Sequence, residues 1–492
     1  MERELRWRNY VTINLYVLAI SLSSGTITPL LLPYLVALFV PPELKNSYLG
    51  IIRVVSLSVA MLVQPLAGLL SDRSTHPLGR RRPYIVVTAL FNVLFLAVVG
   101  VSPLFDGSLV PWLGVSLAYI VLLAGIVLLQ VSSNAGQAAV QGLIPDLVPR
   151  NERGRASGVK AIMELLPAVP LIILGTWVGQ GQVWFVIGVL MATFLVTALI
   201  TLLAVREEPL RARPQERIAA HVWRIAGLTV IFVASTLTGA WLVAFSSSQL
   251  TRLGASVGQQ VAIVGLAGLV AMAGSILIGV YLGASVGIGR GAARQTSFIW
   301  WVINRLLFLA AAGSIQGFAL YYLRDVLHLP DAASWTGVLL GFVAVFLLVS
   351  ALGGGSLADR FGRRRLVALS ALVAAFGTFI LLLARDMTLV IVGGCIVGAG
   401  TGTFMATNWA LGTDLAPPGE AGRYLGIANM AGAGAGIVGA GIGGPLADFF
   451  NALEPGLGYL VIFGLYGALF LLSAVALRQV RLPARESTES PE

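Results

Sequence analysis

The sequence predicts an all-α polytopic membrane protein made of two repeated six-helix bundles with two additional helices inserted between them. Three observations support this fold class. Apolar runs of about 20 residues or more, the length that crosses a bilayer, recur along the 492-residue chain. Charged residues make up 11% of the chain, whereas soluble domains carry about 25%. Two charged motifs also appear twice, in the same order.

The two repeated motifs define the halves. The first reads GLLSDRSTHPLGRRRP over residues 68–83 and GSLADRFGRRR over residues 355–365. The second reads DLVPRNERGRASG over residues 146–158 and aligns without gaps to DLAPPGEAGRYLG over residues 414–426. Each motif falls between corresponding apolar runs of its half, which indicates a duplicated unit.

The apolar runs divide the chain into five parts. We predict a first bundle in residues 1–205, a charged, proline-containing cytoplasmic linker in 206–222, two additional transmembrane helices in 223–296, a second bundle in 297–482 and a disordered polar tail in 483–492. The expected spans are residues 10–40, 48–71, 84–104, 112–142, 156–178, 183–205, 223–247, 259–284, 297–323, 335–357, 366–384, 388–413, 424–447 and 457–480.

The net charge of +10 fits a membrane topology better than a nucleic-acid surface. Most arginines fall in alternate loops, and the other loops hold few basic residues, namely Lys45, Arg252, Arg324 and Arg385. Because basic residues concentrate in cytoplasmic loops, we expect both termini in the cytoplasm of a multi-pass protein of the cell (inner or plasma) membrane. The additional helices must be even in number to keep both motif copies on that side.

The first motif resembles the cytoplasmic loop between the second and third helices of major facilitator transporters, and its copy resembles the loop between the eighth and ninth. With its four extra residues, the first copy resembles the form found in sucrose-type and glycoside–cation symporters. The two additional helices resemble those of fourteen-span members. The resemblance implies a cytoplasmic latch between the two bundles, with gating residues Gly68, Asp72, Arg73, Arg82, Asp359 and Arg360. The alternative is that the arginine clusters only fix the topology.

The sequence does not favour an enzyme. A nucleotide-binding loop ends in Gly-Lys-Ser/Thr, but the two lysines are followed by Asn46 and Ala161. The three histidines are far apart in the sequence, so no zinc-enzyme spacing exists. We therefore expect no cofactor and no metal.

Ionisable side chains within the spans are costly and often functional. Glu164 and Arg305 each lie about nine residues from the predicted cytoplasmic end of their span. We predict that Glu164 faces the central cavity as a proton carrier or as a carboxylate that binds the substrate, and that Arg305 is a counter-charge or binds an anionic group. The alternative for Glu164 is a structural pair with Lys160 one helical turn away. Arg53 and Lys160 could extend to the interface.

Polar side chains in the predicted fourth helix form one stripe, because Gln130, Asn134, Gln137 and Gln141 are spaced by four, three and four residues. Amides both donate and accept hydrogen bonds, which suits sugar hydroxyls; the alternative is helix–helix association. The complete predicted substrate-binding set is Gln130, Asn134, Gln137, Arg305, Gln316, Thr403 and Asn408.

We therefore predict a secondary active transporter that moves a small organic solute, with a sugar or glycoside as the leading class, and that is coupled to protons. One alternative is a proton-driven exporter of lipophilic or amphipathic compounds. Another is a membrane scaffold or sensor that does not transport. The expected partners are the solute, protons and the lipid bilayer, with no nucleic acid, and the expected state is a monomer.

Overall fold

In a computed structural model, the chain is described over residues 6–110, 114–149, 151–207, 209, 218–287, 295–415 and 421–481. Within these residues, 14 helical segments are long and apolar enough to cross a membrane. This confirms the predicted fold class. The predicted tail, residues 483–492, and most of the predicted linker lie outside the described residues.

The first half contains six spans. The first span combines α1 (Trp7–Thr26), a π-helical turn η1 (Ile27–Leu31) and α2 (Leu32–Phe39). A 3-10 turn η2 (Pro42–Leu44) leads into α3 (Lys45–Ser71), and α4 (Arg82–Val101) follows. A short turn η3 (Ser102–Phe105) precedes an antiparallel hairpin of β1 (Leu109–Val110) and β2 (Val115–Ser116). The half ends with α5 (Leu117–Leu147), α6 (Arg153–Leu165), α7 (Ala168–Gly179) and α8 (Val183–Ala204).

Prolines explain the two interruptions in this half. Pro29 and Pro33 lack the amide hydrogen that continues an α-helical ladder, and the chain forms the wider turn η1 there. The fifth span was predicted as one run over residues 156–178, but it is divided into α6 and α7 beside Pro167.

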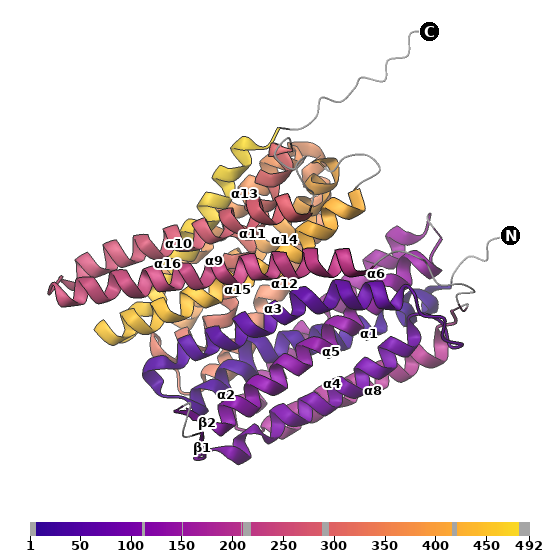
Figure 1. Ribbon diagram of the computed structural model, residues 1–492, viewed down its shortest axis with the longest axis horizontal. Helices are drawn as coiled ribbons and strands as arrows, with labels where there is room; N and C mark the ends of the chain where they lie inside the picture. Colours follow the sequence, from indigo (N-terminus) through magenta and orange to yellow (C-terminus); the bar gives the residue numbers. More distant parts are fainter. Residues whose placement is uncertain are drawn as a thin grey trace, which may run out of the picture.

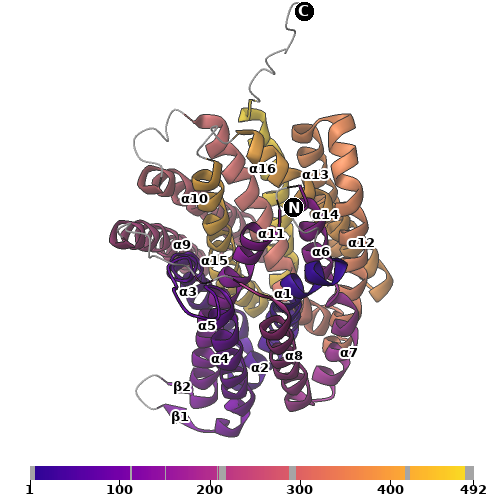
Figure 2. The same ribbon diagram turned by 90° about the vertical axis from the view of Figure 1, so that its right-hand side faces the viewer.

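The second half repeats the six-span arrangement. It comprises α11 (Thr296–Asp325), α12 (Ala332–Phe361), α13 (Arg363–Leu383), α14 (Met387–Leu415), α15 (Ala421–Leu453) and α16 (Leu457–Ala476), which continues into η5 (Leu477–Gln479). The additional helices are α9 (Ile218–Arg252) and α10 (Val257–Gly287). They pack on each other and on α15, and α9 also contacts α3. Figure 2 shows them at the edge of the molecule, beside the junction of α3 and α15.

The two sides of the molecule can be named by their loops. Residues 72–81 and the turn at Gly362 define the motif face, and the β1–β2 hairpin defines the hairpin face, at the opposite end of the helices (Figure 1). The chain enters α1 and leaves α16 on the motif face, because the number of spans between these points is even.

The two halves pack closely near the hairpin face. A Cβ atom on Gly50 of α3 would lie 2.7 Å from the carbonyl oxygen of Ala440 in α15. On the other side of the molecule, a Cβ on Gly175 of α7 would lie 2.8 Å from the Cα of Gly337 in α12. These glycines permit the close approach of helices that is typical of membrane interiors.

A network of polar side chains joins the halves at the same face; we call Lys45, Asn46, Asp325, Asp448 and Tyr459 the hairpin-face network. Lys45 forms an ion pair of 2.5 Å with Asp325, which also accepts a 2.7 Å hydrogen bond from the Tyr459 hydroxyl. The backbone amides of Asn46 and Ser47 donate to the Asp448 carboxylate at 3.2 and 2.6 Å.

The carboxylate of Asp448 therefore occupies the amino-terminal end of α3. Unsatisfied amides and the helix dipole make such an end favourable for negative charge. Asp448 is 7% exposed, so little water competes for these bonds. Sequence analysis did not identify this network, because its members come from four helices and show no pattern along the chain.

We expect Asp448→Asn to open the hairpin face, because the neutral amide loses the charge-assisted bonds to α3. The readout is a cysteine introduced at Ser56 in a Cys395→Ala background, labelled with a membrane-impermeant thiol reagent from the hairpin side. Loss of the charge-assisted bonds lowers the stability of the closed face by roughly 1.4 kcal/mol, so this cysteine should react about tenfold faster in Asp448→Asn. Asp331→Asn, at an exposed position on the same face, is the matched control. An unchanged labelling rate in Asp448→Asn would show that this contact does not hold the face closed.

Candidate functional site

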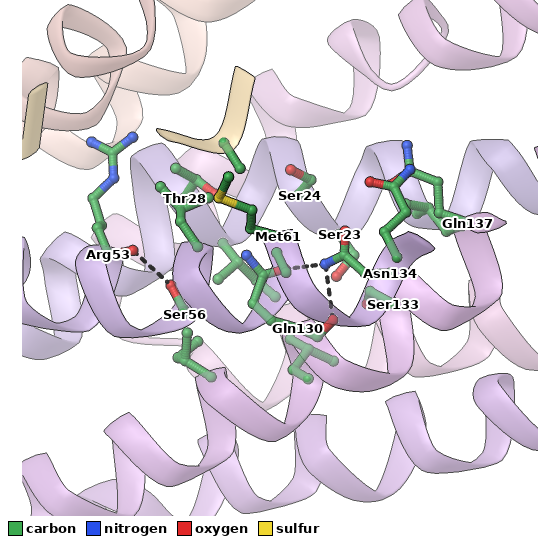
Figure 3. A pocket seen from close by; sticks show the side chains of 18 of the residues that line it. Ser23, Ser24, Thr28, Arg53, Ser56, Met61, Gln130, Ser133, Asn134 and Gln137 are labelled. Atoms are coloured by element: carbon green, nitrogen blue, oxygen red, sulfur yellow. Dashed lines mark hydrogen bonds between the residues drawn. The ribbon is translucent and has the colours of Figure 1, made fainter. Parts of the chain in front are cut away.

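A cavity of about 270 Å³ lies among α1, η1, α3 and α5, and Ala433 of α15 completes its lining. Small-molecule sites range from about 300 to 1,000 Å³, so this cavity suits a small solute. Figure 3 shows its polar side chains, with Arg53 at one end and Gln137 at the other.

Three amides of the predicted stripe line this cavity, namely Gln130, Asn134 and Gln137. The Asn134 side-chain amide donates to the Gln130 backbone carbonyl at 2.9 Å and approaches its side-chain oxygen at 3.4 Å. The fourth member, Gln141, instead accepts a 3.5 Å hydrogen bond from Gln64 of α3. The stripe therefore has two parts: three side chains line the cavity and one bridges two helices.

Hydroxyl groups and a further amide add to the polar wall. Ser23, Ser24 and Thr28 come from the first span, Ser56 and Gln64 from α3, and Ser133 from α5. The π-helical turn η1 reaches the cavity through Thr28, and such turns are frequent at functional sites. The remaining wall is apolar: Ile20, Ile27, Leu32, Leu57, Ala60, Met61, Pro65, Ile126, Leu129 and Ala433.

Arg53 is the only charged residue among the lining residues that the structure describes. It does not extend to the interface. Instead it is 7% exposed and donates through Nη2 to the Gly313 carbonyl of α11 at 3.1 Å. The Nη1 atom of Arg53 lies against Gly317, one turn further along α11. A Cβ atom on Gly317 would overlap Nη1, so only glycine leaves room for the guanidinium group there. No carboxylate pairs with Arg53 in the described part of the chain.

The predicted second-half residues lie elsewhere. Arg305, 8% exposed, donates to Asn408 at 3.2 Å and lies 4.9 Å from the ring of Trp409. Asn408 in turn donates to Asn304 at 2.9 Å. This network joins α11 and α14, and it does not line the cavity described above.

Thr403 and Gln316 also lie outside the lining of that cavity. Thr403 packs beside α12, where a Cβ on Gly354 would lie 3.5 Å from its Cα. Gln316 is exposed on α11, a helix whose residues are mostly buried. The structure therefore brings together the first-half members of the predicted substrate-binding set and leaves the second-half members separate from them.

Glu164 forms the ion pair with Lys160 that sequence analysis gave as the alternative, at 3.1 Å. Its side chain is 42% exposed and does not line the 270 Å³ cavity. Glu164 lies four residues before Ala168, at the start of α7. Ala168 packs against α12, because a Cβ atom on Gly341 of α12 would be 3.6 Å from its carbonyl oxygen. Glu164 thus stands next to the contact between the halves, and its role as a proton carrier stays a prediction.

The repeated motifs contact each other in both halves. In the first half, Arg80 and Arg81 donate to Asp146 at 3.0 and 3.1 Å. In the second half, Arg363 donates to both oxygens of Asp414 at 2.7 Å. Arg363 and Asp414 hold the positions that correspond to Arg80 and Asp146. The same arginine–aspartate bond therefore fixes the motif face of each half.

Two of the predicted latch residues, Asp72 and Arg82, contact residues of the first half. Asp72 pairs with Arg81, a residue that the prediction did not include. Arg82 donates to the backbone carbonyls of Leu78, at 3.2 Å, and Leu202. A Cβ on Gly68 would lie 4.0 Å from the nearest neighbour, so no close helix crossing requires this glycine here.

The second copy of the latch is described only in part. Arg360 is exposed in the last turn of α12, and the side chain of Asp359 lies outside the described residues. The predicted latch between the bundles therefore stays a prediction.

The two arginine–aspartate bonds should differ in strength. The Asp146 side chain is 14% exposed and holds two arginines, whereas the Asp414 side chain is 39% exposed and holds one. We expect Asp146→Asn to lower the free energy of unfolding by about 2 kcal/mol, because Arg80 loses its carboxylate partner and the buried Arg81 keeps only Asp72. Asp414→Asn should cost less than about 1 kcal/mol. Unfolding in mixed detergent micelles measures both, and equal losses would contradict this account.

Comparisons with known proteins agree with this arrangement. The family model described as Major Facilitator Superfamily matches residues 11–315 and 305–492. The chain is 32% identical over 126 residues to the glucose transporter GlcP of Staphylococcus epidermidis, covering 26% of this chain and 28% of that protein. It is 30% identical over 179 residues to the multidrug resistance protein MdtH of Proteus mirabilis, covering 35% and 44%.

A third relative is the sucrose transport protein SUT2 of Oryza sativa subsp. indica, 33% identical over 163 residues, which cover 32% of this chain and 31% of that protein. The chain spans less than half the length of these three curated relatives.

Solved structures match nearly the whole chain. A crystal structure of a D-xylose-proton symporter aligns with a TM-score of 0.63 at 15% identity, covering 95% of this chain and 96% of that one. A POT family transporter in complex with 5-aminolevulinic acid aligns with a TM-score of 0.64 at 13% identity, covering 95% of each chain. Such identities show the fold alone. The family match over both halves and the 14 membrane-capable helices of the described residues lead to one conclusion: the chain is a multi-pass membrane protein that belongs to the Major Facilitator Superfamily.

Proposed function

We propose that this protein imports a small, hydroxyl-rich solute such as a monosaccharide, in symport with protons, across the cell membrane. The observation that carries the proposal is the cavity in which four amides and several hydroxyls face an apolar wall. Amides can donate to and accept from the hydroxyls of a sugar, and the apolar wall can contact the carbon-bound face of its ring. Two relatives bear sugar-transport names.

The charge of the cavity narrows the solute class. Its one charged lining residue is Arg53, which favours neutral or anionic solutes and disfavours cations. An exporter of lipophilic cations would need a carboxylate at the site. The apolar wall and the relative with a multidrug resistance name support a second candidate, an exporter of neutral amphipathic compounds.

The transport cycle that we propose uses the two faces in turn. The hairpin-face network closes one side here. The arginine-rich motif face is assigned to the cytoplasm by the distribution of basic residues. Opening the hairpin face while the motif face closes would expose the cavity to the other side of the membrane. Glu164 is the proposed proton carrier, and Lys160 is its partner in the present state.

Proteoliposomes that hold a pH-sensitive dye test the proposal. We expect lumen acidification when glucose, glucuronate or a disaccharide such as sucrose is added outside, and none with glucosamine, because Arg53 repels its ammonium group. Gln137→Ala should reduce sugar-driven acidification at least tenfold through lost hydrogen bonds. Gln182→Ala, at an exposed position outside the cavity, is the control. Acidification by no sugar, together with efflux of a neutral amphipathic dye, would favour the exporter.

The role of Glu164 can be separated from that of the solute site. We expect Glu164→Gln to abolish acidification while sugar counterflow, which needs no net proton movement, persists. Lys160→Gln removes the same ion pair but keeps the carboxylate, so it should retain acidification. If Glu164→Gln retains full acidification, Glu164 is not the carrier and the Lys160 pair is structural.

A further inference from the structure

A second cavity lies on the motif face of the second half, away from the solute site. It has a volume of about 950 Å³ and is lined by the end of α12, the start of α13 and the end of α16 with η5. α13 and α16 pack against each other, and Figure 2 shows both at the outer edge of the second half. We call this cavity the α13–α16 groove.

The groove is strongly basic. Of its 13 lining residues, five are arginine and none is acidic; the arginines are Arg360, Arg363, Arg364, Arg365 and Arg478. Arg363 is paired with Asp414, and Arg364 donates weakly to the Arg478 carbonyl at 3.4 Å. Within the described ranges, no carboxylate pairs with Arg364, Arg365 or Arg478. Among the residues that the structure describes, these three arginines therefore have no counter-charge.

The equivalent place in the first half holds a carboxylate of the protein itself. There, Glu207 accepts from the backbone amides of Arg81 and Arg82 at 2.9 and 3.0 Å. Glu207 lies three residues after the end of α8, and Arg478 lies two residues after the end of α16. The duplicated motif thus has a carboxylate beside it in one half and an arginine in the other. An external anion bound in the α13–α16 groove would supply, in the second half, the negative charge that Glu207 supplies in the first.

The apolar side chains that line the groove indicate that the anion also has a hydrocarbon chain. Leu372 lies nine residues into α13 from Arg363, a rise of about 13 Å, and Leu471 and Val475 face it from α16. Leu372 and Val475 are 46% and 49% exposed. Both helices are membrane spans, so the arginines lie at the bilayer interface and the apolar side chains lie at the depth of the acyl chains.

We propose that the α13–α16 groove binds an anionic phospholipid. Arg364, Arg365 and Arg478 hold the phosphate, for which guanidinium groups are well suited, and Leu372, Leu471 and Val475 contact an acyl chain. Basic pockets between membrane helices bind acidic headgroups in this way. The lipid would join α13 to α16 at the motif face, as Glu207 joins the start of α4 to the segment after α8.

The test uses the full chain in detergent, with lipid binding measured by native mass spectrometry and by the lipid-induced rise in unfolding temperature. The probes are cardiolipin, phosphatidylglycerol, phosphatidylcholine and inorganic phosphate. The test variant is Arg365→Gln/Arg478→Gln. Its matched control, Arg252→Gln/Arg385→Gln, removes the same charge from exposed positions on the hairpin face.

We expect the unmodified protein and the control to bind cardiolipin and phosphatidylglycerol in preference to phosphatidylcholine. The test variant should bind both anionic lipids about 30-fold more weakly, since each arginine near the surface contributes about fivefold. Equal affinity in the test variant and the control would overturn the proposal. So would equal binding of phosphatidylcholine, or equal stabilisation by inorganic phosphate, which has no acyl chain. A tenfold gain in lipid affinity on removal of residues 483–492 would assign the groove to the acidic carboxyl-terminal segment of the chain instead.

Discussion

The contact between the Asp448 carboxylate and the amino-terminal end of α3 is the interaction on which the rest of this structure depends. α3 belongs to the first half and packs closely against α15 of the second half. Its first residues bond to Asp448 and Asp325 of the second half, and Arg53 reaches the Gly313 carbonyl of α11. Further along, α3 lines the candidate cavity through Met61 and Gln64. One helix therefore connects the hairpin-face network to the candidate cavity.

Because these charged side chains are buried, their contacts limit how the helices can be arranged. In hydrocarbon, a polar group without a partner costs several kcal/mol, so each buried charge restricts the arrangements that the helices can adopt. Lys45 and Arg81 are buried against carboxylates, and they fix opposite faces of the first half. Among the described residues, Arg53 has a backbone carbonyl as its partner and no carboxylate, so its charge is available to the proposed solute. In the α13–α16 groove the arginines lie at the surface, and the proposed lipid rests on their charge and on the apolar side chains beside them.

Much of the fold could be predicted from the sequence because its signals are local. Apolar length gives the fourteen spans, and the spacing of Gln130, Asn134 and Gln137 places them on one face of one helix, where the structure finds them lining the cavity. Contacts between distant helices leave no such pattern. Asp448 and Asn46 are 402 positions apart, and only the packing of α3 on α15 brings them together. The pairing of Arg80 with Asp146 was accessible in principle, because both belong to repeated motifs, yet repetition alone does not show that two motifs touch.

The central claim is that the cavity lies between two faces that open in alternation, with Asp448 holding one of them closed. Spin-label distances measure this most directly, with one pair at Glu43 and Asp331 on the hairpin face and another at His76 and Ser356 on the motif face, all exposed positions. Relative to the parent protein, Asp448→Asn should lengthen the hairpin-face distance and shorten the motif-face distance in the same molecules. Distances that stay unchanged, or that lengthen together, would contradict alternation of the two faces.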